Sequence, residues 1–280
     1  MIQRSNKLTA KQAQFYEENG YLFPVRVFSE EVTTEFRRQF DDYTQQNQER
    51  LKGLIPRQRR AIYSETHLFL PWVYEMVSDS RVLDAVEGVI GPNILAWESA
   101  WFVKFPHDKS FVSWHQDGVY WGLHPPKVTT AWVALCQSIP ENGCMQVMPG
   151  THKVDFQHKD TYAQDNALSR GQELAVQVDQ TKAVNLVLQP GEMSLHHVGV
   201  AHGSGANNSD HPRIGIAIRY IAPEVLQDGV ERQIVQLVRG RDEFGHFDIV
   251  DPPKEGTSSV MIREEADRRL LRNILGGTKQ

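Results

Sequence analysis

The sequence has little cysteine, with only Cys136 and Cys144 among 280 residues. Two thiols cannot build a disulfide framework, and their spacing is not that of a zinc finger. Long apolar runs are also missing, since none approaches the roughly 20 residues that a bilayer-spanning helix needs. The first residues, MIQRSNKLTAKQAQ, lack the apolar stretch of a secretory signal, so we expect a cytoplasmic protein that does not act at a membrane.

An excess of charge of one sign is absent as well. The chain carries 30 Lys+Arg against 35 Asp+Glu, which gives a formal net charge of −5. This weak acidic balance offers no basic surface for nucleic acid or for an anionic membrane. With 40% hydrophobic and 23% charged residues, the composition is that of a globular protein. We therefore expect a small molecule as the partner, while the oligomeric state stays open.

The first ninety residues have a helical pattern. A capping box at Thr9 opens a short helix that should end near Gly20, and Ser29 precedes a longer stripe of apolar residues at helical spacing. Two further helical patterns follow, at 68–76 and 82–90. These segments predict a helical N-terminal part.

After this part, short runs of β-branched and aromatic residues alternate with turn signals. The strands that we expect lie at 97–105, 111–115, 128–137, 144–148, 184–188, 193–201 and 213–221. Seven or more short strands with little helix between them indicate an antiparallel sandwich or barrel such as a jelly roll.

Two other segments carry separate expectations. The polar stretch 153–182 should be a long loop or lid with some helix, and 262–275 should form a closing amphipathic helix. No repeat or linker divides the chain. We expect one domain over 1–280, with helical support over about 1–92, a β core over about 93–222 and a C-terminal extension over 223–280.

The chemistry centres on Trp114-His115-Gln116-Asp117. On a strand, residues i and i+2 point to the same face, so His115 and Asp117 would project together. An imidazole and a carboxylate at this spacing can chelate a divalent metal. Such a tripeptide is common by chance, so a third ligand is required.

The downstream candidates for that ligand are His196, His197 and His202. In one extended strand His196 and His202 would lie roughly 20 Å apart, too far to share an ion. His202 precedes a Gly/Asn-rich loop, and a hairpin across it could bring Arg213 back beside His202. We expect His202 to complete the site, with His197 in reserve should the strand be out of phase.

Two histidines and one carboxylate on one face of an octahedral ion leave three open positions, the arrangement of non-haem Fe(II) oxygenases. A keto acid could fill two of these positions and dioxygen the third. The distal carboxylate of the keto acid would need a bidentate cation, and a guanidinium such as that of Arg213 suits this task.

Four blocks in order resemble the phytanoyl-CoA dioxygenase family of Fe(II)/2-oxoglutarate oxygenases. They are SWHQDGVYWGL (113–123), TTAWVAL (129–135), ENGCMQVMPGTHK (141–153) and HGSGANNSDHPR (202–213). The resemblance implies a mainly β fold with flanking α-helices, a double-stranded β-helix (the jelly-roll, cupin-like barrel). It also implies C–H hydroxylation coupled to oxidative decarboxylation of 2-oxoglutarate, with Fe(II), 2-oxoglutarate and O2 required and succinate and CO2 released.

By position, the resemblance makes His115, Asp117 and His202 the iron ligands and catalytic centre. It pairs Arg213 with the C5 carboxylate of 2-oxoglutarate, with Ser204 nearby, and it places Trp132 and Thr130 beside the cosubstrate. Related halogenating enzymes have a small residue at the position of Asp117, so a hydroxylase is favoured.

The substrate is a harder question. Trp121 resembles a pocket position in relatives that hydroxylate small cationic or zwitterionic metabolites, where an aromatic wall can hold an ammonium group. Tyr120 and Lys104 are further candidate substrate residues. We expect a small zwitterion, with 2-aminoethylphosphonate or its N-trimethyl form as a specific candidate.

Two other classes of protein stay open at this point. A non-redox, metal-dependent cupin-like isomerase or hydrolase would use the same three ligands without a redox cosubstrate. A binding protein would have kept the barrel and lost turnover. The intact ligand set and Arg213 argue against both.

Overall fold

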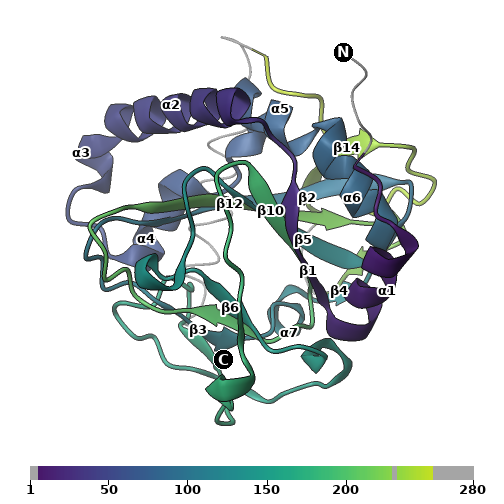
Figure 1. Cartoon of the computed structure of the whole chain (residues 1–280). Helices are drawn as coiled ribbons and strands as arrows, with labels where there is room; N and C mark the ends of the chain where they lie inside the picture. The colour runs from purple at the N-terminus through teal and green to yellow at the C-terminus, as the bar shows by residue number, and fades with distance from the viewer. Residues whose placement is uncertain (1–5, 229–231, 255–280) are drawn as a thin grey trace.

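The computed structural model describes residues 6–228 and 232–254. Its main feature is a seven-stranded sheet in the order β1-β10-β5-β12-β2-β14-β15, which faces a four-stranded sheet in the order β3-β11-β6-β9 (Figure 1). Every neighbouring pair is antiparallel except β14 with β15. Two facing antiparallel sheets with crossing connections are the architecture of a double-stranded β-helix.

The elements have the following bounds. The large sheet consists of β1 (Tyr21–Arg26), β2 (Ile94–Lys104), β5 (Val128–Ala134), β10 (Glu192–His197), β12 (Arg213–Ile221), β14 (Ile234–Arg239) and β15 (Asp248–Ile249). The small sheet consists of β3 (Val112–His115), β6 (Met145–Val147), β9 (Val184–Asn185) and β11 (His202–Ser204). Two minor pairs are β4 (Leu123–His124) with β13 (Leu226–Gln227), and β7 (His158–Asp160) with β8 (Gln172–Leu174). The helices are α1 (Ala10–Asn19), α2 (Glu30–Gln46), α3 (Gln48–Leu51), α4 (Pro56–Tyr63), α5 (Pro71–Val77), α6 (Ser80–Ile90) and α7 (Gly118–Trp121).

The two faces of β12 show how the sequence positions the site. All nine residues are buried, but Ile214, Ile216, Ile218 and Tyr220 point outward into the main hydrophobic core, where the N-terminal helices pack. The alternate residues, from Arg213 to Arg219, point inward between the two sheets. The large sheet is therefore apolar toward its helices and polar toward its interior.

Several helix predictions are confirmed. Thr9 caps α1 in a full capping box, and Gly20 ends the helix in a left-handed conformation. Ser29 caps α2, and α6 ends at Gly91. The pattern at 68–76 starts at the last residue of a 3₁₀ turn, Thr66–Leu68, and includes most of α5.

Other predictions need correction. The first ninety residues are not wholly helical, because β1 forms an edge pair of the large sheet with β10. The strand expected over 193–201 ends at His197, since the chain turns there toward the small sheet. The segment 153–182 contains the β7–β8 pair and short 3₁₀ turns, and no α-helix. The helix expected at 262–275 lies outside the described residues.

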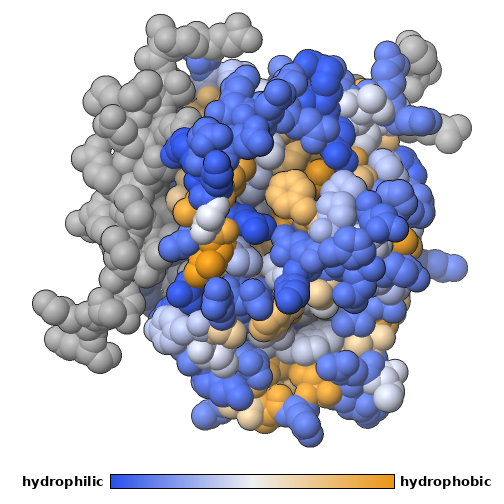
Figure 2. All heavy atoms as spheres, turned by 90° about the vertical axis from the view of Figure 1, so that its left-hand side faces the viewer, coloured by the Kyte–Doolittle hydropathy of each residue, from blue (hydrophilic) through white to orange (hydrophobic). Residues whose placement is uncertain are grey.

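Hydrophilic residues predominate on the face shown in Figure 2, and its apolar residues lie in separate small groups. Within the described ranges, no helix has the length and apolar character needed to cross a bilayer.

Candidate metal centre and cosubstrate site

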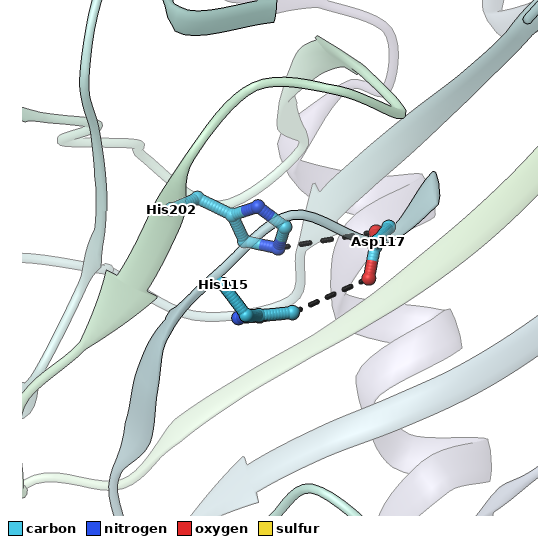
Figure 3. A group of neighbouring side chains, drawn as sticks. All are labelled: His115, Asp117 and His202. Atoms are coloured by element: carbon cyan, nitrogen blue, oxygen red, sulfur yellow. Dashed lines mark ion pairs between the residues drawn. The ribbon is translucent and has the colours of Figure 1, made fainter. Parts of the chain in front are cut away.

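His115, Asp117 and His202 point toward one another between the two sheets (Figure 3). One potential ligand atom from each residue lies within 4.8 Å of the others, and all three residues are buried. The Nε2 atom of His115 is 3.3 Å from Oδ1 of Asp117, and Nε2 of His202 is 3.9 Å from Oδ2. The three side chains that the sequence analysis selected as metal ligands are thus brought together.

Backbone hydrogen bonds orient both imidazoles. The Nδ1 atom of His115 lies 2.8 Å from the carbonyl oxygen of Ser113, and that of His202 lies 3.0 Å from the carbonyl of Val200. A carbonyl oxygen can only accept, so each Nδ1 carries the proton and each Nε2 keeps its lone pair toward Asp117. This second contact is typical of metal-binding histidines. The donor set fits a divalent ion such as Fe(II).

The electrostatics favour the same protonation states. Burial, followed by the nearby His115, lowers the pKa of His202 to about 4, so its imidazole is neutral near pH 7. Burial alone would raise the pKa of Asp117, but His115 and His202 outweigh burial and hold that pKa below its usual range. A neutral imidazole and an ionised carboxylate are the forms that bind metal.

The expectation that His115 and Asp117 project from one strand was wrong for Asp117. Strand β3 ends at His115, and Asp117 has helical backbone angles at the start of α7. Its position depends on a turn rather than on strand alternation. The backbone N–H of Gly118 donates to Val198 O at 3.0 Å, which fixes this turn against the chain that leads to β11.

Gln116 is a positioning residue that the sequence analysis did not single out. Its side-chain amide donates to the backbone carbonyls of Thr151, Val154 and Gly199, and its Oε1 accepts from the N–H of Phe156. These bonds tie the turn between the metal-site residues to two distant loops. Only its place inside the motif could have signalled this role.

The distance argument against His196 was wrong. The rings of His196 and His202 lie 4.8 Å apart, because the chain turns between β10 and β11 and the two residues belong to facing sheets. Burial, followed by His202, lowers the pKa of His196 well below its usual value. His197 points elsewhere: its Nδ1 accepts from the N–H of Gly199, and its ring lies against His152.

Arg213 and Ser204 line the same cavity as the three metal-site residues. Arg213 is 2% exposed and donates a 2.9 Å hydrogen bond to the carbonyl oxygen of Gly143, while its Nε has no hydrogen-bond partner in the described part of the chain. Burial lowers the pKa of Arg213 to about 10, so it stays charged near neutral pH. The expected β11–β12 hairpin is absent, since β11 and β12 belong to different sheets and face each other across the cavity.

Lys104 lies beside Arg213 and lines a neighbouring cavity that Arg213 also borders. The two residues are register partners on β2 and β12, and Lys104 Nζ donates to Ser204 Oγ at 2.7 Å and to the carbonyl of Gly205. Burial, followed by Arg213, lowers the pKa of Lys104 well below its usual value. The structure therefore places Lys104 with the residues that the resemblance assigns to the cosubstrate, away from Tyr120 and Trp121.

Trp132 and Thr130 both line the cavity. The indole of Trp132 lies over Gly215, where an added Cβ would come within 2.3 Å of the ring, and the Arg213 guanidinium lies 5.3 Å from its centroid. The Oγ1 atom of Thr130 is buried without a hydrogen-bond partner among the described residues.

Tyr120 and Trp121 do not line this cavity. The Arg170 guanidinium lies 4.8 Å from the Tyr120 ring, and that of Arg219 lies 5.0 Å from the Trp121 ring. Trp97 packs against Trp121 as well. Trp121 thus already holds a cation of this chain.

The facing sheets and the buried His-Asp-His cluster define a jelly-roll protein with a mononuclear metal site. Residues 16–215 match the family model described as phytanoyl-CoA dioxygenase (PhyH). The chain belongs to the phytanoyl-CoA dioxygenase family.

The curated relatives of this chain are described as acting on different compounds. The chain is 27% identical over 272 residues to the peroxisomal phytanoyl-CoA dioxygenase of Bos taurus, covering 88% of this chain and 81% of that protein. It is 25% identical over 237 residues to an ectoine dioxygenase of Streptomyces avermitilis, covering 78% and 80% of the two chains. A probable alpha-ketoglutarate-dependent hypophosphite dioxygenase of Stutzerimonas stutzeri is 29% identical over 161 residues, 56% of each chain.

Solved structures agree on the fold. The non-heme monooxygenase ThoJ, in its apo form, superposes with a TM-score of 0.78 at 29% identity, covering 94% of this chain and 99% of that one. CytC3 with Fe(II) and alpha-ketoglutarate superposes with a TM-score of 0.67 at 24% identity, covering 92% and 98% of the two chains, which is a likeness of fold.

Family membership and the cluster together decide between the classes left open by the sequence. The protein is an Fe(II)/2-oxoglutarate-dependent oxygenase of the hydroxylase type, acting on a small molecule, with Fe(II), 2-oxoglutarate and O2 as its requirements. The reading as a non-redox isomerase or hydrolase is set aside.

Proposed function

We propose that this chain hydroxylates a C–H bond of a small, zwitterionic metabolite, releasing succinate and CO2. 2-Aminoethylphosphonate or its N-trimethyl form is our specific candidate. The observation that carries the reaction type is the buried cluster of His115, Asp117 and His202, in one cavity with the Arg213 guanidinium. The relative described as a hypophosphite dioxygenase supports a search among phosphorus-containing compounds.

We assign the metal to His115, Asp117 and His202. When bound, Fe(II) with 2-oxoglutarate and O2 supplies the oxidising power for attack on a C–H bond. The two imidazoles offer Nε2 because their Nδ1 protons are held by backbone carbonyls. Asp117 would contribute one negative charge to the bound metal and stands where halogenating relatives have a small residue, which supports hydroxylation over halogenation.

We assign the C5 carboxylate of 2-oxoglutarate to Arg213, with Ser204 and Lys104 beside it. The Nε of Arg213 is buried without a hydrogen-bond partner among the described residues, so an incoming carboxylate would satisfy it. Trp132, which packs over Gly215, would form one side of the cosubstrate site. The aliphatic lining from Val112, Met145 and Leu168 would keep water from this end of the cavity.

The test is substrate-dependent succinate formation by the Fe(II)-loaded protein in air, screened over small amines, amino acids and aminophosphonates. We expect 2-aminoethylphosphonate or its N-trimethyl form to raise succinate release well above the rate with 2-oxoglutarate alone. A panel in which only neutral or long-chain compounds stimulate release would contradict the assignment of a small zwitterion.

A further inference from the structure

One row of inward-facing residues crosses the large sheet beside the metal cluster. In register, His196 on β10 is opposite Thr130 on β5, Thr130 is opposite Arg219 on β12, and Arg219 is opposite Glu98 on β2. Register partners in antiparallel strands point to the same face. His196, Thr130 and Arg219 all line the cavity that contains the metal cluster.

This row has unmet hydrogen-bonding capacity. Among the described residues, no hydrogen-bond partner is found for Nδ1 of His196, Oγ1 of Thr130 or Nε of Arg219. Arg219 is 5% exposed, and Thr130 and His196 are still more buried. Buried polar groups without partners are costly, and in native proteins they commonly mark the place of a ligand or an ordered water.

Two guanidinium groups meet at one end of the row. Arg219 Nη1 lies 3.2 Å from Oε1 of Glu98, but Arg60 from α4 lies 3.4 Å from the same oxygen. One carboxylate thus serves two guanidinium groups. Trp121 lies against the guanidinium of Arg219 and holds it in place, so the side chain is positioned before a ligand arrives.

Arg219 and Arg213 are at opposite ends of the inward face of β12, about 20 Å apart along an extended strand. Arg213 is the group that we assign to 2-oxoglutarate, while the row of Arg219 lies beside Asp117, to which His196 Nε2 approaches within 4.0 Å. The C5 carboxylate of the cosubstrate and the row therefore occupy different parts of the cavity.

We propose that Arg219, together with Thr130 and His196, binds an oxyanion of the substrate, a carboxylate or a phosphonate. The substrate is then a small molecule whose anionic end lies on Arg219 and whose reacting carbon faces the metal. This inference rests on the proposed function and deepens it, because it selects molecules with an anionic end. The substrate is then recognised mainly through its anionic group at Arg219, and not through an ammonium group at Trp121.

The experiment measures anion binding without knowledge of the true substrate. The anaerobic protein, loaded with Fe(II) and saturating 2-oxoglutarate so that Arg213 is occupied, is titrated with acetate or with methylphosphonate. Its melting temperature is followed, with sodium chloride at equal ionic strength as the baseline. A ligand that binds only the folded protein raises this temperature, and the rise grows with the logarithm of its concentration once that concentration exceeds the dissociation constant. We expect one of the two anions to do so, and the better one identifies carboxylate or phosphonate.

Three variants test whether the anion binds at Arg219, because each has its own expected change in anion affinity. Arg219→Gln should weaken the anion about 10- to 100-fold, as expected for lost hydrogen bonds to a charged group. Glu98→Gln should strengthen it, because Glu98 competes for the same guanidinium. Arg239→Gln is the matched control, since Arg239 is also an ion-paired arginine of the large sheet but is only half-buried and lies outside the cavity, and it should respond as the wild type does.

The inference is overturned if neither anion raises the melting temperature, if Arg219→Gln responds as the wild type does, or if Glu98→Gln weakens binding. Should Arg219→Gln fail to fold, Arg219→Lys and Glu98→Gln still give opposite expected shifts. The visible band of Fe(II) with 2-oxoglutarate is recorded on the same samples. Its presence with no anion response defeats this inference alone, while its absence defeats the proposed function.

Discussion

Arg213 and Lys104 lie directly opposite each other on β12 and β2, and both side chains donate to the carbonyl oxygen of Gly143, at 2.9 and 3.5 Å. Two like charges in a cross-strand pair repel each other. Both side chains are 2% exposed, so solvent screens this repulsion weakly. The negative charge of a dicarboxylate cosubstrate would offset this repulsion. Binding of such a cosubstrate would account for two cationic side chains in a buried site.

Arg213→Ala should raise the KM for 2-oxoglutarate about 100-fold, because a bidentate charge-assisted contact to its carboxylate is lost. The KM for the substrate should change little. Initial rates of succinate formation at varied 2-oxoglutarate measure this, with Arg213→Lys expected between the two. An unchanged dependence on 2-oxoglutarate in Arg213→Ala would mean that the carboxylate is held elsewhere.

Lys104→Met tests whether this lysine serves the cosubstrate or the substrate. Its Nζ contacts Ser204 and the carbonyl of Gly205 at the Arg213 end, so we expect the KM for 2-oxoglutarate to rise about 10-fold with that for the substrate unchanged. Steady-state kinetics with each compound varied in turn separates the two. The opposite pattern would return Lys104 to the substrate side.

Gly215→Ala should displace the Trp132 indole, because the new methyl group would come within 2.3 Å of the ring. Overpacking of this kind costs about 1 to 3 kcal/mol, and the displaced ring would narrow the cavity. We expect a lower melting temperature and weaker 2-oxoglutarate binding. Gly205→Ala is the control, since an added Cβ there meets nothing within 4 Å. Equal effects from both substitutions would refute the packing argument.

His197 predicts a pH dependence of stability. Burial, followed by His152, lowers its pKa to about 4, and its Nδ1 accepts a hydrogen bond that protonation would break. The unfolded chain takes up this proton near pH 6.5 and the folded chain does not, so stability falls as the pH drops from about 6.5 to about 4. The loss reaches about 3 kcal/mol at most.

Urea unfolding of the protein with chelator present, at pH 7 and pH 5, measures this effect. His197→Gln should reduce the difference between the two pH values by the share of His197, leaving the shares of His196 and His202, whereas substitution of the exposed His124 by Gln should leave the difference unchanged. A His197→Gln variant that retains the full pH dependence would assign it to other groups.

Sequence reasoning found the parts of the molecule that local chemistry dictates. The capping residues Thr9 and Ser29 and the stop at Gly20 define α1 and α2. The spacing of His115 and Asp117, the loop after His202 and the family resemblance selected the three side chains of the cluster. What it missed depends on the tertiary path of the chain. β1 follows a helix immediately and contains Pro24, and the approach of His196 to His202 depends on a turn between two sheets.

The row of Arg219 was missed for a similar reason. Its members come from separate strands, and only the register of β10, β5, β12 and β2 places them side by side. A single arginine within RIGIAIRYI gives no sign that Arg60 and Glu98 share its surroundings. Trp121 was expected to hold an ammonium group of the substrate, whereas the cation beside it in the structure is the side chain of Arg219.

The most direct test of the central claim is the visible spectrum of the anaerobic protein with one equivalent of Fe(II) and an excess of 2-oxoglutarate. The account predicts the weak charge-transfer band of a keto acid chelated to Fe(II), lost in Asp117→Ala and retained in Asp228→Ala, an exposed carboxylate outside the cavity. A wild-type protein that is fully loaded with Fe(II) and 2-oxoglutarate but shows no such band would contradict it.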